Sequence, residues 1–306
     1  MTKTFIIIVT YNGMRWLEKC LASIPAQYPV IIVDNASTDD TVQFITDHYP
    51  QHRLFAQSQN LGFGKANNLG LTHALQEGAE SCFLLNQDAY LRTDTIEKLQ
   101  ICYENHPEFS LLSPIHFDGT DRKLDRLFSY YLQYDHNPDF YSDAINQELK
   151  QVYEIAFVNA AGWFLPKKTL QTIGGFDPVF FHYGEDENYC HRLKYHGLKI
   201  GVVPSAAMIH DRAKRKMEDI KRYSIKDVDK RMLKIKHYVA NPNVPNNEVI
   251  LRKKIKEFKR KSVKNILKGN FDAYTYYRSL TKNLSNELDQ IVQHVELNKT
   301  TGPHYL

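Results

Sequence analysis

The carboxylate of Asp88 lies three residues beyond the end of a short apolar run, in the stretch Phe83-Leu84-Leu85-Asn86-Gln87-Asp88-Ala89. The run from Cys82 to Leu85 predicts a buried strand. In an open α/β sheet, ligands bind beyond the carboxyl ends of the strands, so a carboxylate at this position could hold a cation. Asp88 could equally cap a following helix, because Asp is common around helix starts. The residue types alone leave both interpretations open.

Three successive carboxylates, Glu185, Asp186 and Glu187, follow Gly184 at the start of a predicted helix. The helix macrodipole favours acidic residues there, so simple capping is one interpretation. The other is a site close to a ligand, because a glycine lets the backbone approach a ligand closely. His210 ends the ordered α/β pattern, and a lone histidine is more often a structural residue than a ligand.

A glycine-containing loop, Asn60-Leu61-Gly62-Phe63-Gly64-Lys65-Ala66-Asn67-Asn68, precedes another predicted helix. It lacks the third glycine of the dinucleotide fingerprint and follows the third strand instead of the first. It also lacks the glycine spacing and the Ser or Thr of a P-loop. The loop is therefore either a tight turn or a ligand contact of another kind.

Apolar periodicity predicts the elements that must position these residues. Short strands alternate with short helices, which predicts a right-handed parallel βαβ layer. The expected strands are 4–9, 30–33, 53–56, 82–85, 110–112, 199–203 and 206–209, and the expected helices are 14–24, 42–48, 64–75, 93–105, 167–173 and 185–195; a regular pattern also returns over 153–160.

Residues 117–150 break this pattern with a polar, tyrosine-rich stretch. A long irregular segment in a compact domain is usually a functional loop or lid. Tyrosine rings suit contacts with carbohydrate, although packing on the surface is their commoner role.

The net charge of +4 conceals a strong asymmetry, because residues 212–268 hold 20 Lys and Arg against 6 Asp and Glu, and the remainder holds 19 against 29. Within this basic region, residues 249–268 predict an amphipathic helix. Such a helix either lies on an anionic membrane surface or packs on the body of the protein.

No apolar run approaches the roughly 18 residues that a membrane span requires, and no signal-peptide layout is present. We therefore expect an intracellular protein. The four cysteines are scattered, which favours reduced thiols over disulfides or a zinc site.

Five motifs, in order along the chain, resemble those of family 2 nucleotide-sugar glycosyltransferases of the GT-A fold, with closest similarity to bacterial rhamnosyltransferases. The resemblance covers residues 3–211. The motifs are Val9-Thr10-Tyr11-Asn12, Val33-Asp34-Asn35-Ala36-Ser37-Thr38-Asp39, Asn60-Leu61-Gly62-Phe63-Gly64 with Asn67, Asn86-Gln87-Asp88, and Gly174-Gly175-Phe176-Asp177 followed by Gly184-Glu185-Asp186-Glu187.

The resemblance implies a Rossmann-like, mostly parallel mixed sheet with flanking helices over residues 1–211, followed by a basic helical extension over 212–306. The nucleotide-binding half would be about 1–115 and the acceptor half about 116–211. It implies that Asp34 reads the nucleobase, that Asp88 and His210 bind Mg²⁺ or Mn²⁺, and that Asp186 is the catalytic base, with Glu185 as rival. The remaining implied contacts are Thr10, Tyr11, Asn12, Asn35, Ser37, Asn60, Gly62, Gly64, Asn67 and Gln87 for the donor, and Trp163 and Glu187 for the acceptor.

The chain departs from the usual pattern at Asn86, where many relatives carry the first Asp of an Asp-x-Asp motif, so metal dependence is less firmly implied than the fold. The implied activity is inverting transfer of a sugar, from dTDP-rhamnose or a UDP-hexose, to a saccharide or lipid-linked saccharide of a bacterial surface polysaccharide such as lipopolysaccharide. The alternatives are a sugar nucleotidyltransferase and a non-catalytic carbohydrate-binding protein. We expect a cytoplasmic protein, possible peripheral contact with the inner face of the membrane, a possible oligomer, and no nucleic-acid partner.

Overall fold

The computed structural model describes residues 3–212 and 219–306, which form two compact units. The first unit is an α/β domain that also includes residues 301–306, and the second is helical and covers 214–300. The expected extension of 212–306 therefore differs from the structure at its end, because the last six residues pack with the α/β domain.

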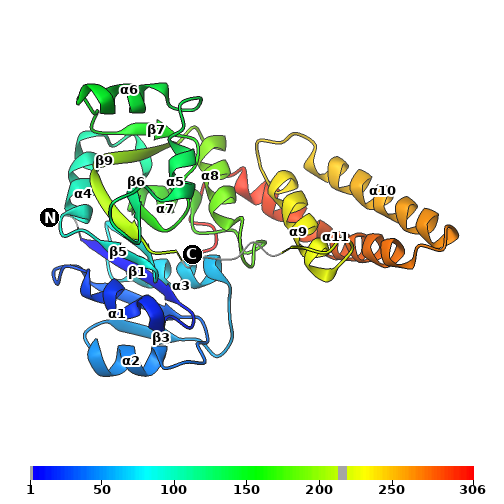
Figure 1. The fold of residues 1–306 in the computed structure, drawn as a ribbon, viewed down its shortest axis with the longest axis horizontal. Helices are drawn as coiled ribbons and strands as arrows, with labels where there is room; N and C mark the ends of the chain where they lie inside the picture. Colours follow the sequence, from blue (N-terminus) through cyan, green and yellow to red (C-terminus); the bar gives the residue numbers. More distant parts are fainter. Residues whose placement is uncertain (1–2, 213–218) are drawn as a thin grey trace. The chain divides into compact units, whose positions relative to one another are not determined.

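The described strands of the first unit form one sheet in the order β3-β2-β1-β4-β8-β6-β9-β5, with β7 also paired to β9 (Figure 1). Neighbours β3, β2, β1 and β4 are parallel, and β8, β5 and β7 run antiparallel to the strands they pair with. The bounds are β1 Thr4–Thr10, β2 Val30–Asp34, β3 Arg53–Ala56, β4 Ser81–Asn86, β5 Ala89–Leu91, β6 Phe109–Asp118, β7 Tyr153–Ile155, β8 Gly162–Pro166 and β9 Lys199–His210.

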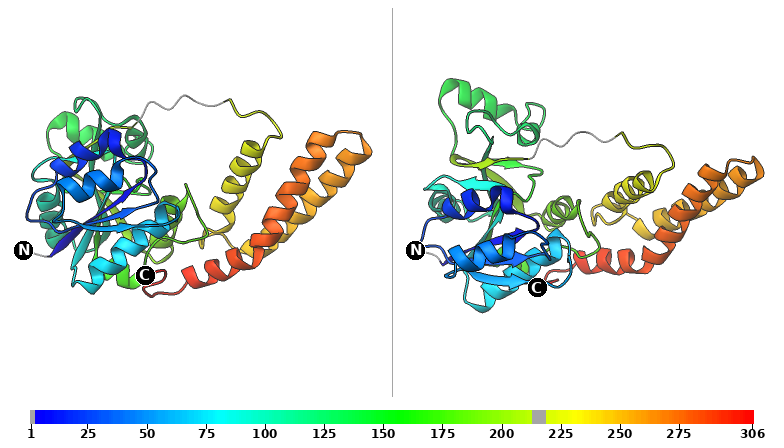
Figure 2. Two further views of the ribbon diagram at one scale, coloured as in Figure 1. Left: turned by 90° about the horizontal axis from the view of Figure 1, so that it is seen from below. Right: turned by 60° about the horizontal axis from the view of Figure 1, so that its bottom comes forward.

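Helices cover both faces of this sheet, as the short apolar strands require (Figures 1 and 2). Strand β1 shows why: Ile6 and Ile8 belong to one buried cluster, and Phe5 and Ile7 belong to the other. A strand that is buried on both faces reads as a continuous apolar run. The bounds are α1 Met14–Ala22, α2 Thr41–His48, α3 Phe63–Gln76, α4 Thr95–Asn105, α5 Arg126–Tyr131, α6 Pro138–Asn146, α7 Lys167–Ile173 and α8 Glu185–Tyr195.

The expected mixed α/β architecture is confirmed, and three local predictions are corrected. Strands β5 and β8 were not anticipated, and β5 has only three residues, too few to show a period. The segment expected to be irregular contains α5 and α6, each of which begins with a side-chain cap, from Asp125 and Asn137. The two short strands expected at 199–203 and 206–209 are one continuous strand, β9.

The parallel pairing aligns the carboxyl ends of the central strands. Thr10 lies opposite Asp34 across β1 and β2, and Val9 lies opposite Asn86 across β1 and β4. The polar residues that follow these strands therefore share one edge of the sheet, where ligands bind in folds of this kind.

The helical unit contains α9 Ile225–Val239, α10 Asn247–Leu267 and α11 Phe271–Asn298. Helices α10 and α11 lie side by side in every view, joined by a short turn at residues 268–270 (Figures 1 and 2). Leu251 and Phe258 of α10 and Leu280 and Leu284 of α11 are buried in this unit. Among the described residues, no helix is both long enough and apolar enough to cross a membrane.

The C-terminal residues return to the α/β domain through backbone hydrogen bonds. Gly302 N–H donates to the Thr172 carbonyl at 2.8 Å, and Gly175 N–H donates to the His304 carbonyl at 2.8 Å. Gly174 has a φ of +75°, and a Cβ there would lie 1.9 Å from the His304 carbonyl oxygen. The glycine pair thus allows the tail to pack against the backbone that leads to α8.

Candidate active site

Asp34 is the buried centre of a hydrogen-bonded network at the ends of β1 and β2. One oxygen, Oδ2, accepts from Thr10 Oγ1 at 2.8 Å and from Ser37 Oγ at 2.5 Å, and Oδ1 accepts from Ser37 N–H at 2.9 Å. These donors satisfy the desolvated carboxylate and fix its orientation. The structure therefore brings together three of the residues expected to surround the nucleotide.

Two further contacts extend this network along the sheet edge. Asn12 N–H donates to Ser37 Oγ at 2.8 Å. The side-chain amide of Gln87 forms two hydrogen bonds with the backbone of Tyr11: its Oε1 accepts from the Tyr11 N–H at 2.9 Å, and its Nε2 donates to the Tyr11 carbonyl at 3.1 Å. The turns after β1, β2 and β4 are thereby fastened to one another, and the Tyr11 ring remains exposed.

The glycine loop is shaped by a pair of asparagines. Asn35 Nδ2 donates to Asn60 Oδ1 at 2.9 Å, and the same oxygen accepts from Gly62 N–H at 2.8 Å. Gly62 has a φ of +82°, and a Cβ on it would lie 2.0 Å from the Phe181 carbonyl oxygen. A Cβ on Gly64 would lie 3.6 Å from the Glu185 Cβ. The loop therefore packs directly against the acidic start of α8.

Asn67, expected at the nucleotide, is buried within α3 and donates to the Phe63 carbonyl at 3.0 Å. Its neighbour Asn68 has a role that sequence reasoning missed. Asn68 Nδ2 donates to the Phe176 carbonyl at 2.8 Å, and Asn68 Oδ1 accepts from Phe176 N–H at 2.7 Å. Both amides are buried, and their hydrogen bonds support the backbone of the glycine loop and of the segment before α8.

Asp88 and His210 meet because β5 pairs with β9. Ala89 lies opposite His210 in this antiparallel pair, and Asp211 N–H donates to the Asp88 carbonyl at 2.8 Å. His210 Nε2 lies 3.4 Å from Asp88 Oδ1. Burial alone would raise the pKa of Asp88, but the hydrogen bond and charge of His210, with a contribution from Arg212, hold that pKa below its usual value.

A divalent cation fits this pair as a site with two protein ligands. An ionised carboxylate and an imidazole nitrogen are suitable ligands, and their atoms are close enough to share one ion. No group of three His, Cys, Asp or Glu that could bind a metal occurs among the described residues. The other coordination positions would therefore belong to ligand phosphates and water, as is usual for Mg²⁺.

The three carboxylates at the start of α8 differ in their exposure to solvent. Glu185 is 6% exposed, whereas Asp186 and Glu187 are half-buried. Asp186 Oδ1 accepts from Glu187 N–H at 2.8 Å. Burial raises the pKa of Asp186, the backbone hydrogen bond opposes this rise, and the Glu187 charge adds to it. Asp186 is thus a carboxylate of increased basicity that solvent can reach.

Trp163, expected to contact an acceptor, is fully buried. Its ring lies between Phe176, with a centroid distance of 5.6 Å, and Tyr189, at 5.3 Å. The structure therefore places Trp163 in the core, where it cannot reach an acceptor. The exposed rings next to the acidic helix are instead Phe181 and Tyr183, which sequence reasoning did not select.

Arg212 is a further residue that sequence reasoning missed, although it follows His210 closely. Its Nε donates to Asp125 Oδ2 at 2.9 Å, and Asp125 Oδ1 in turn caps α5 by accepting from Phe128 N–H at 2.8 Å. Its buried Nη2 has no hydrogen-bond partner among the described residues. Arg212 thus adds positive charge beside Asp88 and retains a donor for an anionic ligand.

The same helix α5 supports the ring of His210 through another histidine. His116 stacks on Phe128 with a centroid distance of 4.4 Å and contacts His210 edge to face at 5.9 Å. Burial lowers the pKa of His116 well below its usual value, so its ring is neutral. His116 of β6 and Phe128 of α5 therefore pack behind the His210 ring and hold it in place.

The GT-A fold and this arrangement define a glycosyltransferase. The family model described as Glycosyl transferase family 2 matches residues 5–164, and the chain belongs to this family.

Rhamnosyltransferases are among its relatives. The chain is 24% identical over 209 residues to the dTDP-rhamnosyl transferase RfbF of Shigella flexneri, covering 67% of this chain and 68% of that protein. It is 26% identical over 234 residues to the N-acetylglucosaminyl-diphospho-decaprenol L-rhamnosyltransferase of Mycobacterium tuberculosis, covering 68% and 76%.

Solved structures agree on the fold. TarS 1–349 of S. aureus in complex with UDP has a TM-score of 0.52 at 14% identity, covering 97% of this chain and 89% of that one. GalNAc-T7 with UDP, GalNAc and Mn²⁺ has a TM-score of 0.53 at 12% identity, covering 80% and 52%.

The close approach at Gly62 yields a prediction with a matched control. We expect Gly62→Ala to lower the free energy of unfolding by at least about 1 kcal/mol more than Gly78→Ala. Both glycines have a φ of +82°, but a Cβ at Gly78 would have no atom within 4 Å. Urea denaturation of the two variants measures the difference, and equal losses would show that the contact with Phe181 is not tight.

Proposed function

We propose that this enzyme transfers a sugar from a nucleoside-diphosphate sugar to a hydroxyl group of a saccharide or lipid-linked saccharide, with inversion at the anomeric carbon. The observation that carries the proposal is the pairing of β5 with β9, which sets His210 Nε2 3.4 Å from Asp88 at the sheet edge that also holds Asp34. Charge on a departing diphosphate needs positive partners. A cation at this pair and the guanidinium of Arg212 would provide them.

We assign donor and metal binding to residues by their positions at the sheet edge. Asp34, with Thr10 and Ser37, would receive the nucleobase end of the donor, and the loop at Gly62 and Gly64 would adjoin the nucleotide. Asp88 and His210 would hold Mg²⁺ or Mn²⁺, which when bound supplies positive charge to the phosphate oxygens. Asn86 supplies no carboxylate here, so this chain would rely more on the phosphates themselves.

Asp186 would act as the general base. It would accept the proton of the acceptor hydroxyl while that oxygen bonds to the anomeric carbon and the bond from this carbon to the diphosphate oxygen breaks. One such displacement inverts the centre. The half-buried position and raised pKa of Asp186 support this role over Glu185, which is more deeply buried. Glu187 is left to orient the acceptor or to cap α8.

The names of two relatives favour a particular donor and acceptor class. One is named for dTDP-rhamnosyl transfer, and another for rhamnosyl transfer to a diphosphate-linked decaprenol. We therefore propose dTDP-rhamnose as the donor, with a UDP-hexose as the alternative, and synthesis of a surface polysaccharide as the setting. A sugar nucleotidyltransferase would instead form a nucleotide sugar from a nucleoside triphosphate.

A donor screen tests the activity and its metal requirement together. We expect nucleoside diphosphate release from one nucleotide sugar, loss of this release in EDTA, and restoration by Mg²⁺ or Mn²⁺. Asp88→Ala and His210→Ala should each reduce the rate. Full turnover in EDTA with both variants near wild type would contradict the metal site. Absence of release from every donor and acceptor would favour a carbohydrate-binding protein.

Asp186→Asn tests the base, because the amide keeps the shape of the side chain but cannot accept the proton. We expect kcat to fall on the order of 10² to 10⁴-fold with little change in donor affinity. The base must be ionised, so wild-type kcat should decline as the pH falls through the raised pKa of Asp186. Glu185→Gln is the comparison: a small effect of Asp186→Asn beside a large effect of Glu185→Gln would transfer the role.

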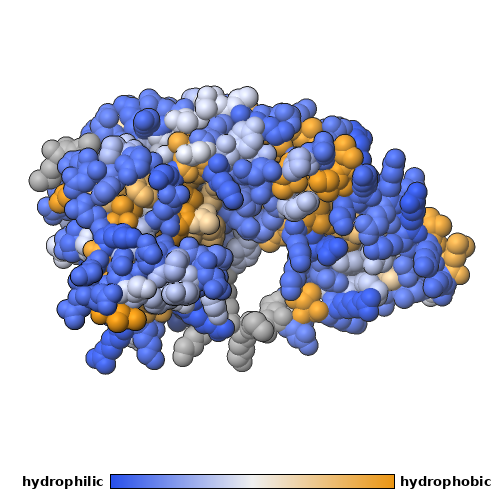
Figure 3. Space-filling view, turned by 90° about the horizontal axis from the view of Figure 1, so that it is seen from above, coloured by the Kyte–Doolittle hydropathy of each residue, from blue (hydrophilic) through white to orange (hydrophobic). Residues whose placement is uncertain are grey.

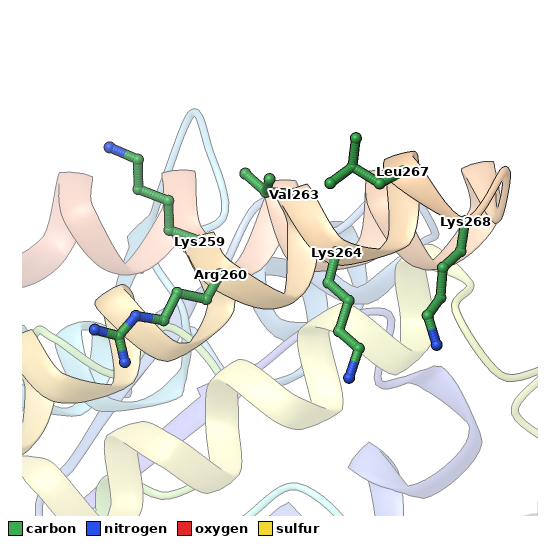
Figure 4. Close-up of a pocket in the computed structure, with 6 residues that line it drawn as sticks. All are labelled: Lys259, Arg260, Val263, Lys264, Leu267 and Lys268. Carbon is green, nitrogen blue, oxygen red and sulfur yellow. The ribbon is translucent and has the colours of Figure 1, made fainter.

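We also propose that the basic part of α10 contacts an anionic membrane surface, where a lipid-linked acceptor would lie. The apolar residues of the amphipathic helix expected over 249–268 lie in two different environments. Leu251 and Phe258 are buried in the helical unit, whereas Val263 and Leu267 are 53% and 83% exposed. Figure 4 shows these two side chains pointing to the same side of α10, toward which Lys259 also extends, whereas Arg260, Lys264 and Lys268 point the other way; all six line one pocket.

Apolar side chains also gather near the turn between α10 and α11 within a hydrophilic surface (Figure 3), and Phe271 at that turn is exposed. A helix binds an anionic bilayer by burying apolar side chains in it and by the attraction of Lys and Arg to the anionic lipids, and this face of α10 carries both kinds of residue.

Leu267→Ser tests this contact against a matched control, Ile225→Ser, because Ile225 of α9 is 81% exposed. We expect Leu267→Ser to weaken cosedimentation with phosphatidylglycerol vesicles about tenfold, since burying one leucine is worth about 1.5–3 kcal/mol. Ile225→Ser should bind like wild type, and added salt should release both. Equal binding of Leu267→Ser and wild type would remove α10 from the membrane contact.

A further inference from the structure

A cavity of about 230 Å³ lies among the three helices of the helical unit, away from the catalytic residues in sequence. A single water needs roughly 10–15 Å³ of cavity volume, so this space can hold a larger polar group. Segments from all three helices and from the turn before α9 contribute to its wall. The lining residues are Arg222, Tyr223, Asp227, Arg231, Phe258, Lys261, Tyr276, Tyr277 and Leu280.

The wall carries an excess of positive charge. It includes three cations, Arg222, Arg231 and Lys261, and one carboxylate, Asp227. Lys261 is paired with Glu257 at 2.6 Å. Neither arginine forms an ion pair with a carboxylate among the described residues. Two guanidinium groups therefore remain available to a ligand.

The single carboxylate of the wall already has a structural role. Asp227 Oδ2 accepts from Tyr223 N–H at 2.8 Å, while Asp227 N–H donates to Ser224 Oγ at 3.2 Å. Ser224 is the N-cap of α9, and Asp227 reaches back to the backbone N–H of the residue before it. These two hydrogen bonds fix the backbone beside Arg222.

Three tyrosines complete the wall and supply neutral donors. Tyr276 packs against Tyr223 with a centroid distance of 5.2 Å and against Tyr277 at 5.1 Å. Burial raises the pKa of Tyr276, and the charge of Asp227 raises it further. The Tyr276 hydroxyl therefore stays protonated at neutral pH and can donate to an anion.

We propose that this cavity binds a phosphate or diphosphate group. Guanidinium groups match the oxygens of such an anion with paired donors, and tyrosine hydroxyls can fill the remaining positions. The site shares no lining residue with the apolar and basic face at Val263 and Leu267. It also stands independently of the proposed transferase chemistry, because none of its residues belongs to the α/β domain.

Calorimetric titration of the full-length protein with inorganic diphosphate tests the site. We compare Arg222→Gln and Arg231→Gln with Lys221→Gln and Lys230→Gln, which remove the same charge one residue away without touching the wall. We expect each arginine variant to weaken one binding component about tenfold or more, and each lysine variant to leave it unchanged. The catalytic site is the same in all four proteins, so any diphosphate bound there cancels in the comparison.

Arg222 is exposed and precedes α9, so its replacement leaves the helix core intact even if Arg231→Gln fails to fold. Binding to phosphatidic acid vesicles then identifies the source of the group. Loss of vesicle binding in Arg222→Gln would point to a lipid headgroup, and loss of soluble diphosphate binding alone would point to a free anion. Diphosphate binding that is equally tight in Arg222→Gln and Lys221→Gln would overturn the proposal.

Discussion

The antiparallel pairing of β5 with β9 is the constraint on which the active site depends. It joins the turn after the fourth strand to the end of the last strand, residues more than a hundred positions apart in the chain. A shift of this register by one residue would turn either Asp88 or His210 to the opposite face of the sheet. The two strands therefore determine whether Asp88 and His210 face each other, although β5 is only three residues long.

The sequence was sufficient for the central strands, because each is buried on both faces and reads as an apolar run. It was also sufficient for the positions of Asp34, Gly62, Asp88 and Asp186, since each follows a strand or lies at the start of a helix; their roles in binding and catalysis stay predictions. Strand β5 escaped prediction because its pairing is entirely nonlocal, and a three-residue strand has no period to detect.

Residues whose role depends on long-range packing could not be predicted in the same way. Trp163 was expected to contact the acceptor, but its ring packs in the core beside Phe176. Arg212 looked like the first residue of a basic tail, but Asp125, 87 positions away, holds it at the site. Residues 249–268 were expected to form one amphipathic helix, and in the structure Leu251 and Phe258 of this helix are buried whereas Val263 and Leu267 are exposed.

The backbone pairing of Gly302 with Thr172 and of His304 with Gly175 gives the chain an insertion topology. The helical unit leaves the α/β domain after the last strand and the chain re-enters that domain at its end, so the helices form a long closed loop. The entropic cost of closing a loop rises only slowly with its length, so a long insertion is tolerated. A stop codon after β9 would therefore remove residues 301–306 together with the helical unit, and so delete part of the domain that it was meant to isolate.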